Sequence, residues 1–177
     1  MNSFYTSQEL EQIGFASIGK NVLISRKASI YSASSISLGS NVRIDDFSIL
    51  SGKIIIGSNV HISAYVALYG SMGIFLQDFS GISARTTIYS AVDDFSGEYM
   101  VGPMSPNTHV SGGPVIMEKY TQIGASCVVM PNIIIREGSV VGSMSFVNKT
   151  LDPWGVYVGI PVYKLKDRSK RLLDLNI

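Results

Sequence analysis

Aliphatic residues recur every six positions along much of this chain. One unbroken run comprises Leu38, Ile44, Leu50, Ile56, Ile62 and Leu68, and a second comprises Met117, Ile123, Val129, Ile135, Val141 and Val147. Amphipathic helices need apolar spacings of three and four, and antiparallel folds bring hairpin signals such as Asn-Gly that do not accompany this pattern. A period of about six residues per side is typical of a parallel β-helix.

Each six-residue unit also carries a second inward position, four residues after the first, which is small or β-branched. These positions include Val42, Ser48, Ile54, Val60 and Val66, and later Thr121, Cys127, Ile133, Ser139 and Ser145. Three units of a short strand plus a corner would close one triangular coil. Stacked coils then bury a continuous apolar column, so the expected fold class is all-β.

Three segments leave the six-residue pattern and divide the chain. Residues 1–17 are expected to form a short N-terminal cap, because Thr6 and Glu9 have capping-box spacing and Tyr5 and Leu10 could form a hydrophobic staple. Residues 18–163 are expected to form the β-helix, with one long, functional loop insertion at 89–113. Residues 164–177 are basic and are expected to form a C-terminal helical tail.

Composition narrows the function classes. The net charge is +1 and 15% of residues are charged, which gives no general electrostatic reason to expect nucleic acid or an anionic membrane as a partner. One cysteine and two histidines are too few for a closed Cys/His zinc site, so no metal is expected. The N-terminus lacks a secretory pattern and no apolar run reaches the length of a membrane span. We therefore expect a cytoplasmic protein, and the low charged fraction favours self-association.

The repeats resemble a known family. The hexads IGSNVHI, IGASCVVMPNIII and VVGSMSFV, followed by DPWGVYVGIPVYKLK, resemble the hexapeptide-repeat acyltransferases, which implies a left-handed parallel β-helix and a homotrimer. The segments NVRIDDFSILSGK, HISAYVALYG and ISARTTIYSAVDDFSGEY are similar to those of enzymes that acylate nucleotide-linked 4-amino-4,6-dideoxysugars of the viosamine and anthrose type. That resemblance implies acyl transfer from acyl-CoA, with acetyl-CoA as the first choice. The acceptor would be the amine of a dTDP-linked 4-amino-4,6-dideoxyhexose used for surface polysaccharide such as lipopolysaccharide.

The densest acidic cluster lies in the loop insertion. Asp93, Asp94 and Glu98 directly follow a repeat strand. A carboxylate beside the sugar amine can orient it and stabilise the positive charge that develops on nitrogen; a solvated loop whose aspartates cap turns is the alternative. With the resemblance, Asp93 is the catalytic candidate, and Asp94 and Glu98 are candidates for substrate binding.

Three residues near the strand that leads to this loop are further substrate-binding candidates. Ser83 could hydrogen-bond a sugar hydroxyl or phosphate, or serve only as a corner residue. Arg85 could clamp a diphosphate, or pair with Asp78 or Asp94. Tyr89 lies at the end of the same strand.

His61 and His109 are the conventional neutral-pH bases of the chain, and His61 is the catalytic candidate. A hydroxyl acceptor needs such a base, whereas a neutral amine does not. The alternative function is therefore an O-acetyltransferase that acts on a sugar hydroxyl. A non-catalytic β-helix scaffold would have no acyl-CoA affinity, and a metal-dependent hydrolase of the carbonic-anhydrase type would need three histidines.

The resemblance also implies where CoA binds. The pantetheine arm would follow a groove between neighbouring subunits, past Gly124 and Ala125 and then Gly142 and Ser143. The adenine end would meet the following residues: Gly159, Ile160 and Pro161 beside the ring, and Lys164, Lys166 and Arg168 beside the phosphates. Cys127 falls on an inward position and is expected to be a core thiol. Trp154 either marks the turn out of the helix or lies near the groove.

Overall fold

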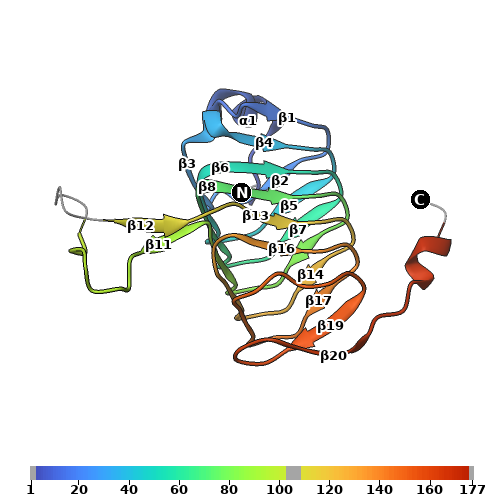
Figure 1. Cartoon of the computed structure of the whole chain (residues 1–177). Helices are drawn as coiled ribbons and strands as arrows, with labels where there is room; N and C mark the ends of the chain where they lie inside the picture. Colours follow the sequence, from blue (N-terminus) through green and yellow to red (C-terminus); the bar gives the residue numbers. More distant parts are fainter. Residues whose placement is uncertain (1–2, 103–108, 176–177) are drawn as a thin grey trace.

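The computed structural model describes residues 3–102 and 109–175. Within these ranges the chain winds into stacked coils of three strands each (Figure 1). In-register parallel pairing joins equivalent strands of successive coils. The predicted parallel β-helix is confirmed.

The three faces of the prism are built from the following strands. The first face contains β1 (Ser17–Ile18), β4 (Ile36–Leu38), the second halves of β6 (Ile49–Ile56) and β8 (Ala67–Leu76), β13 (Val115–Met117) and β16 (Ile133–Ile135). The second face contains β2 (Leu23–Ile24), β5 (Val42–Ile44), β7 (Val60–Ile62), β9 (Gly81–Ile82), β14 (Gln122–Ile123), β17 (Val140–Val141) and β19 (Gly155–Val158). The third face contains β3 (Ser29–Tyr31), the first halves of β6 and β8, β10 (Thr87–Tyr89), β15 (Val128–Val129) and β18 (Phe146–Val147). Strands β6 and β8 bend around a corner and so belong to two faces.

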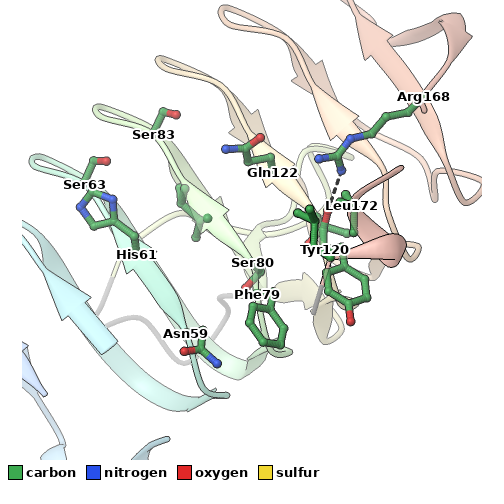
Figure 2. Close-up of a pocket in the computed structure, with 14 residues that line it drawn as sticks. Asn59, His61, Ser63, Phe79, Ser80, Ser83, Tyr120, Gln122, Arg168 and Leu172 are labelled. Carbon is green, nitrogen blue, oxygen red and sulfur yellow. Dashed lines mark hydrogen bonds between the residues drawn. The ribbon is translucent and has the colours of Figure 1, made fainter. Parts of the chain in front are cut away.

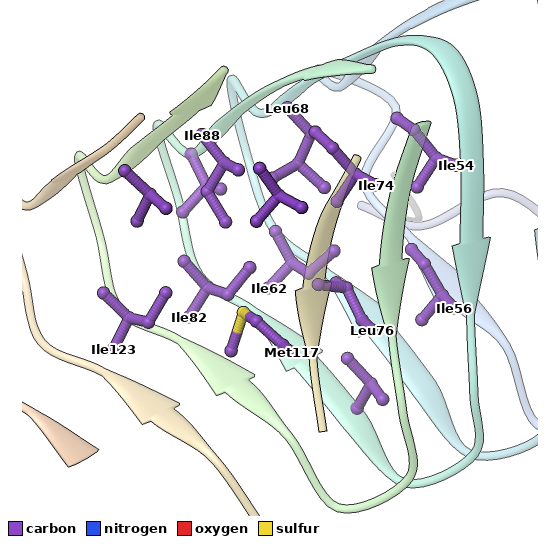
Figure 3. Packing of buried hydrophobic residues seen from close by; sticks show 14 of the residues in the cluster. Ile54, Ile56, Ile62, Leu68, Ile74, Leu76, Ile82, Ile88, Met117 and Ile123 are labelled. Atoms are coloured by element: carbon purple, nitrogen blue, oxygen red, sulfur yellow. The ribbon is translucent and has the colours of Figure 1, made fainter. Parts of the chain in front are cut away.

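The six-residue register forms the core (Figure 3). Ile44, Leu50, Ile62 and Leu68 are fully buried, and so are Val129 and its equivalents in later coils. Burial of each such side chain contributes about 1.5–3 kcal/mol. Four polar members of the second inward set are buried as well and donate to backbone carbonyls: Ser48, Thr121, Ser139 and Ser145. The Ser48 hydroxyl, for example, donates to the Ser63 carbonyl oxygen at 3.0 Å.

The corners rely on residues in the left-handed backbone region. Between the first and second faces, Asn21, Asn41 and Asn59 adopt φ near +60°, which asparagine tolerates better than most residues. Their side-chain amides form a ladder with N···O distances of 3.1 and 3.0 Å. Further along the same corner Phe79 stacks on Tyr120, with ring centroids 5.5 Å apart.

Trp154 continues this corner column. Its ring lies 6.5 Å from that of Tyr120, and the Lys170 ammonium lies over it at 5.5 Å. The tryptophan therefore marks the last corner of the solenoid before the tail begins.

The N-terminal end is closed by α1 (Ser7–Ile13). Its capping box is present: the Glu9 amide donates to the Thr6 hydroxyl at 3.3 Å, and the Thr6 amide donates to the Glu9 carboxylate at 2.7 Å. Leu10 is buried as part of the core, and Tyr5 is partly buried against the same core. The capping box is thus confirmed, and the helix shields the open end of the apolar column.

The C-terminal segment differs in part from the expected helix. Tyr163–Asp167 forms β20, which pairs antiparallel with β19. Up to residue 175, where the described part of this segment ends, only η2 (Arg171–Asp174) is helical, as a 3₁₀ turn. The last strand of a solenoid exposes an edge of unpaired backbone groups, and β20 satisfies that edge. A second 3₁₀ turn, η1 (Ala33–Ser35), lies between β3 and β4. No helix in the described ranges is both long and apolar enough to cross a membrane.

The predicted loop insertion leaves the solenoid as a hairpin. Strands β11 (Ala91–Asp93) and β12 (Val110–Gly112) pair antiparallel and project sideways from the corner between the third and first faces (Figure 1). Residues 103–108 of the insertion lie outside the described residues. The hairpin carries exposed apolar side chains, with Phe95 81%, Val101 70% and Met100 63% accessible.

Candidate functional site

A groove of about 420 Å³ lies on the second face, between strands β7, β9 and β14 and the tail (Figure 2). His61 and Ser83 line it, together with Gln122 and Arg168. Gly81 pairs with His61 on one side and with Gln122 on the other. Because Gly81 has no side chain, the floor of the groove is open between those two residues.

His61 is held by a carboxylate on the neighbouring strand. Its Nε2 lies 2.8 Å from Asp45 Oδ2, and Arg43 Nε lies 2.7 Å from Asp45 Oδ1. Burial opposes the charge of Asp45, but the hydrogen bonds from His61 and Arg43 outweigh burial and lower the pKa of this carboxyl. Asp45 is therefore a fixed negative charge beside the imidazole.

Ser83 belongs to a column of small residues on the corner between the second and third faces. Strand register stacks Ser63, Ser83, Gly124 and Gly142 on one another, since each follows a paired residue of β7, β9, β14 or β17. The Ser83 amide donates to the Ile123 carbonyl at 2.9 Å. This column runs along the prism from the groove toward the tail.

The glycines of this column are required by close backbone approach. A Cβ on Gly124 would lie 2.5 Å from the Ser143 amide nitrogen, and one on Gly142 would lie 2.8 Å from Val158 Cγ1. The Ala125 amide donates to the Ser143 hydroxyl at 3.1 Å. These four residues therefore form the corners themselves and present mostly backbone to the outside.

Two buried side chains support the same corner from within. The Thr86 hydroxyl donates to the Gly124 carbonyl at 2.8 Å and accepts from the Cys127 amide at 3.2 Å. The Cys127 thiol lies 3.2 Å from the Gly142 carbonyl oxygen. Burial raises the pKa of this thiol, in agreement with the expected core role of Cys127.

The basic residues near the C-terminus divide into two groups. Ile160 and Pro161 are exposed, and Lys164 pairs with Asp167 at 2.7 Å beside exposed Lys166. Arg168 instead donates through Nη1 to the carbonyls of Tyr120 and Gly138 at 2.7 and 2.8 Å, and burial lowers its pKa. Arg168 therefore anchors the tail against the solenoid.

The acidic residues of the hairpin have different surroundings. Asp93 ends β11 with an exposed side chain. The Asp94 carboxylate accepts from the Ser96 hydroxyl and from the Ser96 amide at 2.8 Å, which lowers the pKa of Asp94. Glu98 is exposed, and its amide donates to the Ser96 hydroxyl. Asp94 therefore caps a local turn, as the alternative interpretation of this loop expected. Asp93 is the carboxylate that is exposed at the end of the strand.

His109 lies across the same hairpin. Its ring contacts Tyr99, with centroids 4.7 Å apart, and its carbonyl accepts from the Asp94 amide at 3.0 Å. Both contacts of His109 are with other residues of the hairpin insertion.

Arg85 and Tyr89 lie at opposite ends of the segment that leads to the hairpin. Arg85 has φ +61° at the corner after Ser83, and its guanidinium lies 5.8 Å from the Tyr65 ring centroid. Tyr89 stacks on Tyr69 at 5.3 Å at the base of the hairpin. The partners considered for Arg85 have other contacts: Asp78 is 4.0 Å from Lys119, and Asp94 bonds to Ser96.

Within one chain the candidate residues form two separate groups. His61 and Ser83 share the groove, whereas Asp93 projects from a different corner of the prism. Sequence reasoning missed Asp45 and Gly81. Both could have been found from the register, because Asp45 follows Ile44 as Ser83 follows Ile82, and Gly81 occupies the position of His61 one coil later.

Among the described residues, no group of three or more His, Cys, Asp and Glu side chains could hold a metal ion. No family model matches the chain.

Whole-chain comparisons give close relatives. The chain is 40% identical over 173 residues to a dTDP-4-amino-4,6-dideoxy-D-glucose acyltransferase of Escherichia coli, covering 95% of this chain and 90% of that protein. It is 54% identical to AntD, an N-acyltransferase from Bacillus cereus solved with dTDP and 3-hydroxybutyryl-CoA, with a TM-score of 0.95 over 98% of this chain and 94% of AntD. A hexapeptide-repeat acetyltransferase from Vibrio cholerae, 18% identical with a TM-score of 0.68 over 92% of this chain and 80% of that one, shares the left-handed β-helix fold.

Other solved forms of AntD carry a substitution at one serine, or at one aspartate ten residues further along. Two of the forms with the serine replaced contain dTDP-4-amino-4,6-dideoxyglucose and coenzyme A, and a third contains dTDP and coenzyme A.

Proposed function

Because this chain belongs to the dTDP-4-amino-4,6-dideoxyglucose acyltransferase family, we propose that it transfers an acyl group from acyl-CoA to the amine of a dTDP-linked 4-amino-4,6-dideoxyhexose. Acetyl-CoA is the first choice of donor. The product would be a building block of surface polysaccharide, made in the cytoplasm.

The spacing of two residues points to Ser83 and Asp93 as members of the active site. Ser83 and Asp93 are separated by ten residues, the spacing of the serine and aspartate that are replaced in the AntD variants. Ser83 lines the groove and Asp93 is exposed at the end of β11. Both side chains are thus available to a ligand.

The chemistry suits these two residue types. A carboxylate at Asp93 can accept hydrogen bonds from the sugar amine, orient its lone pair, and stabilise the charge that grows on nitrogen during attack on the thioester. A hydroxyl at Ser83 can hydrogen-bond a polar group of the bound substrates. We assign Arg85, Tyr89, Asp94 and Glu98 to the surroundings of the nucleotide sugar.

The acyl donor would follow the corner column past Gly124 and Gly142. Backbone is presented there because a side chain on Gly124 would collide with Ser143, so a thin pantetheine arm can lie close to the chain. Exposed Ile160, Lys164 and Lys166 lie further along and are assigned to the adenine and phosphates. Arg168 would act indirectly by fixing the tail.

We further propose that the active site is shared between subunits of a homotrimer. Ser83 and Asp93 lie on different corners of one prism, so both can act on one sugar only if Asp93 comes from a second copy. The projecting hairpin, with exposed Phe95, Met100 and Val101, is suited to reach a neighbour.

The direct test is release of CoA thiol by the purified protein, with dTDP-4-amino-4,6-dideoxyglucose compared against neutral sugars and other nucleotide sugars. Turnover confined to the amino sugar supports N-acylation. Turnover confined to neutral sugars would replace the proposal with O-acetylation. CoA binding without turnover would refute the proposed acceptor class. Failure to bind acyl-CoA at all would favour the alternative of a non-catalytic β-helix scaffold.

Asp93→Asn should lower kcat/KM for the amino sugar by about two orders of magnitude or more, since it removes the charge that orients the amine. Binding of acyl-CoA should change little. Glu11→Gln, on the exposed surface of α1, is the matched carboxylate control and should behave as the wild type. Unchanged kinetics for Asp93→Asn would contradict its role.

Mixing two variants, each impaired at one of the two residues, tests the shared site. In trimers formed at random from Ser83→Ala and Asp93→Asn subunits, about one quarter of the interfaces would join an intact Ser83 to an intact Asp93. Activity should therefore return on mixing under conditions that exchange subunits. No recovery in trimers shown to be mixed would mean that each site is built from one chain.

A further inference from the structure

The C-terminal tail is anchored at one residue and then stands apart from the solenoid. Among the described residues, Arg168 is the last that hydrogen-bonds to the coils: its amide donates to the Trp154 carbonyl at 2.8 Å, and its guanidinium donates to two further backbone carbonyls. Beyond it η2 lies away from the second face (Figure 1), and the groove occupies the space between them. Leu173 and Leu175 are 49% and 66% exposed. Exposed apolar side chains on a segment held away from its own solenoid are suited to contact a second chain.

The groove has a polar end and an apolar end (Figure 2). His61 and Ser83 line the polar end, toward the corner between the second and third faces. Phe79 and Tyr120, which stack on each other, line the apolar end together with Leu172 of the tail. The substrates are assigned to the polar end beside Ser83. The apolar end is therefore left without an assigned occupant.

The projecting hairpin has the right side chains and the right reach for this end. Phe95 and Met100 are 81% and 63% exposed, and both follow Asp93, which the proposed shared site brings to Ser83 of a second copy. Phe79 and Ser83 lie four residues apart across β9, so the two ends of the groove are at most about 14 Å apart along this strand. The seven residues from Asp93 to Met100 can span up to about 25 Å. A hairpin that delivers Asp93 to the polar end is therefore long enough to cover the apolar end as well.

The hairpin and the tail carry opposite charge. Residues 91–102 contain three carboxylates and no Lys or Arg, whereas residues 164–175 contain five basic and two acidic residues. Glu98 on the hairpin and Arg171 on the tail are both exposed, and the ion pairs formed within the described ranges include neither of them. Opposite charges favour contact of hairpin with tail, and like charges disfavour contact of hairpin with hairpin or tail with tail.

We infer, on the basis of the proposed shared active site, that residues 168–175 form a clasp which holds the hairpin of the next subunit in the groove. Leu172 packs against the apolar side chains of that hairpin, and Arg168 anchors the clasp to its own solenoid. The hairpin leaves the prism from the corner opposite the second face (Figure 1), so each contact joins the hairpin of one copy to the tail of another. Contacts of this head-to-tail kind close into a ring. The clasp thus positions Asp93 without touching the substrates.

Cross-linking between introduced cysteines tests the contact directly. Phe95→Cys and Leu172→Cys are combined in one full-length chain, which is treated with bismaleimide reagents of two lengths. Because the two positions lie on opposite sides of one prism, a link can form only between chains. The double variant should give covalent dimers and trimers on a denaturing gel. Each single variant and the wild type should run as monomers, since Cys127 is buried.

Leu172→Asp measures the contribution of the clasp to association, and Leu173→Asp is the matched control, because Leu173 belongs to the same turn but does not line the groove. Leu172→Asp should weaken association by at least about tenfold in sedimentation velocity, since it places an unpaired charge in an apolar contact. Its specific activity should fall on dilution and return at high protein concentration. Asp93→Asn should stay impaired at every concentration. Leu173→Asp should associate as the wild type does.

Cross-linking and sedimentation require no turnover, so they decide the clasp separately from the proposed function. Association of Leu172→Asp equal to that of the wild type, or an associated double-cysteine variant that gives no covalent dimers with either reagent, would overturn the clasp. Turnover of the amino sugar by the same protein would still support N-acylation. Efficient cross-linking in a protein that does not turn over the amino sugar would refute the proposed function and leave the clasp in place.

Discussion

Replacing Thr86 by valine should weaken the corner that carries the proposed acyl-donor site. Thr86 is fully buried, and its hydroxyl joins two coils by donating to the Gly124 carbonyl and accepting from the Cys127 amide. Valine keeps the shape of the side chain and removes both bonds. Val66 occupies the equivalent position one coil earlier, so the backbone accommodates valine there.

The cost follows from the two groups left unpaired. A buried donor or acceptor without a partner costs about 1–3 kcal/mol. The Cys127 amide is buried, whereas the Gly124 carbonyl is only partly buried and costs less. With about 1 kcal/mol returned by the added methyl group, the net loss is about 2 kcal/mol. For a chain of this size that corresponds to a fall of about 4–8 °C in Tm. Because the Gly124 carbonyl loses its support, KM for acyl-CoA should also rise several-fold.

Thermal unfolding at one fixed protein concentration measures the first effect, because the proposed trimer would make Tm depend on protein concentration. Steady-state kinetics measure the second. Thr87→Val, on the outward side of the same strand, is the control and should change stability by no more than about 0.5 kcal/mol. A Tm within about 2 °C of the wild type would refute the assignment of this hydroxyl as a structural cross-link.

Two further predictions concern the cap and the groove. The Arg26 hydrogen bond, followed by those from Thr6, lowers the pKa of Glu9 from 4.5 to about 2, so its stabilisation is complete above about pH 4.5 and is lost as pH falls toward 2. The difference in Tm between wild type and Glu9→Gln should therefore narrow as pH falls from 4.5 to 2. A difference that stays constant over this pH range would contradict the stabilising role of the Glu9 carboxylate. Alanine at Gly81 has room, because its Cβ would lie 3.7 Å from Gln122 Cγ, so Gly81→Ala should hold or raise Tm while KM for the nucleotide sugar rises. Gly124→Ala should lower Tm, because its Cβ would lie 2.5 Å from the Ser143 amide nitrogen. An equal change in Tm for Gly81→Ala and Gly124→Ala would refute the claim that only Gly81 has room for a side chain.

The fold was predictable because one spacing rule applies to every coil. Ile44, Leu50 and Ile62 are buried for the same geometric reason, and the insertion was visible as the place where the rule stops. The tail was less predictable. Its basic residues are compatible with a helix, and Tyr163–Asp167 is extended because β19 offers an unpaired edge, which is a property of the assembled solenoid.

The candidate site was predictable by residue type and less so by arrangement. Asp93 and Ser83 stand out in the sequence, but contact between Asp45 and His61 joins different coils and depends on the registers of β5 and β7. In the sequence, Asp93 and Asp94 are adjacent aspartates with nothing to distinguish their roles. They differ in the structure because the Ser96 hydroxyl and amide occupy Asp94.

The coil at the centre of the groove, which contains β9, departs from the repeat in several ways. Val42 and Val60 fill the second inward position on the second face, but Ser80 takes that place in the next coil, and its buried hydroxyl has no hydrogen-bond partner among the described residues. Gly81 follows it where other coils carry a side chain, and the hairpin leaves at the end of the same coil. Each departure removes local stability, and leaving such a hydroxyl unpaired costs about 1–3 kcal/mol. A solenoid tolerates this because its stability is summed over neighbouring coils, so regular coils on both sides can hold one irregular coil in the shape that the chemistry needs.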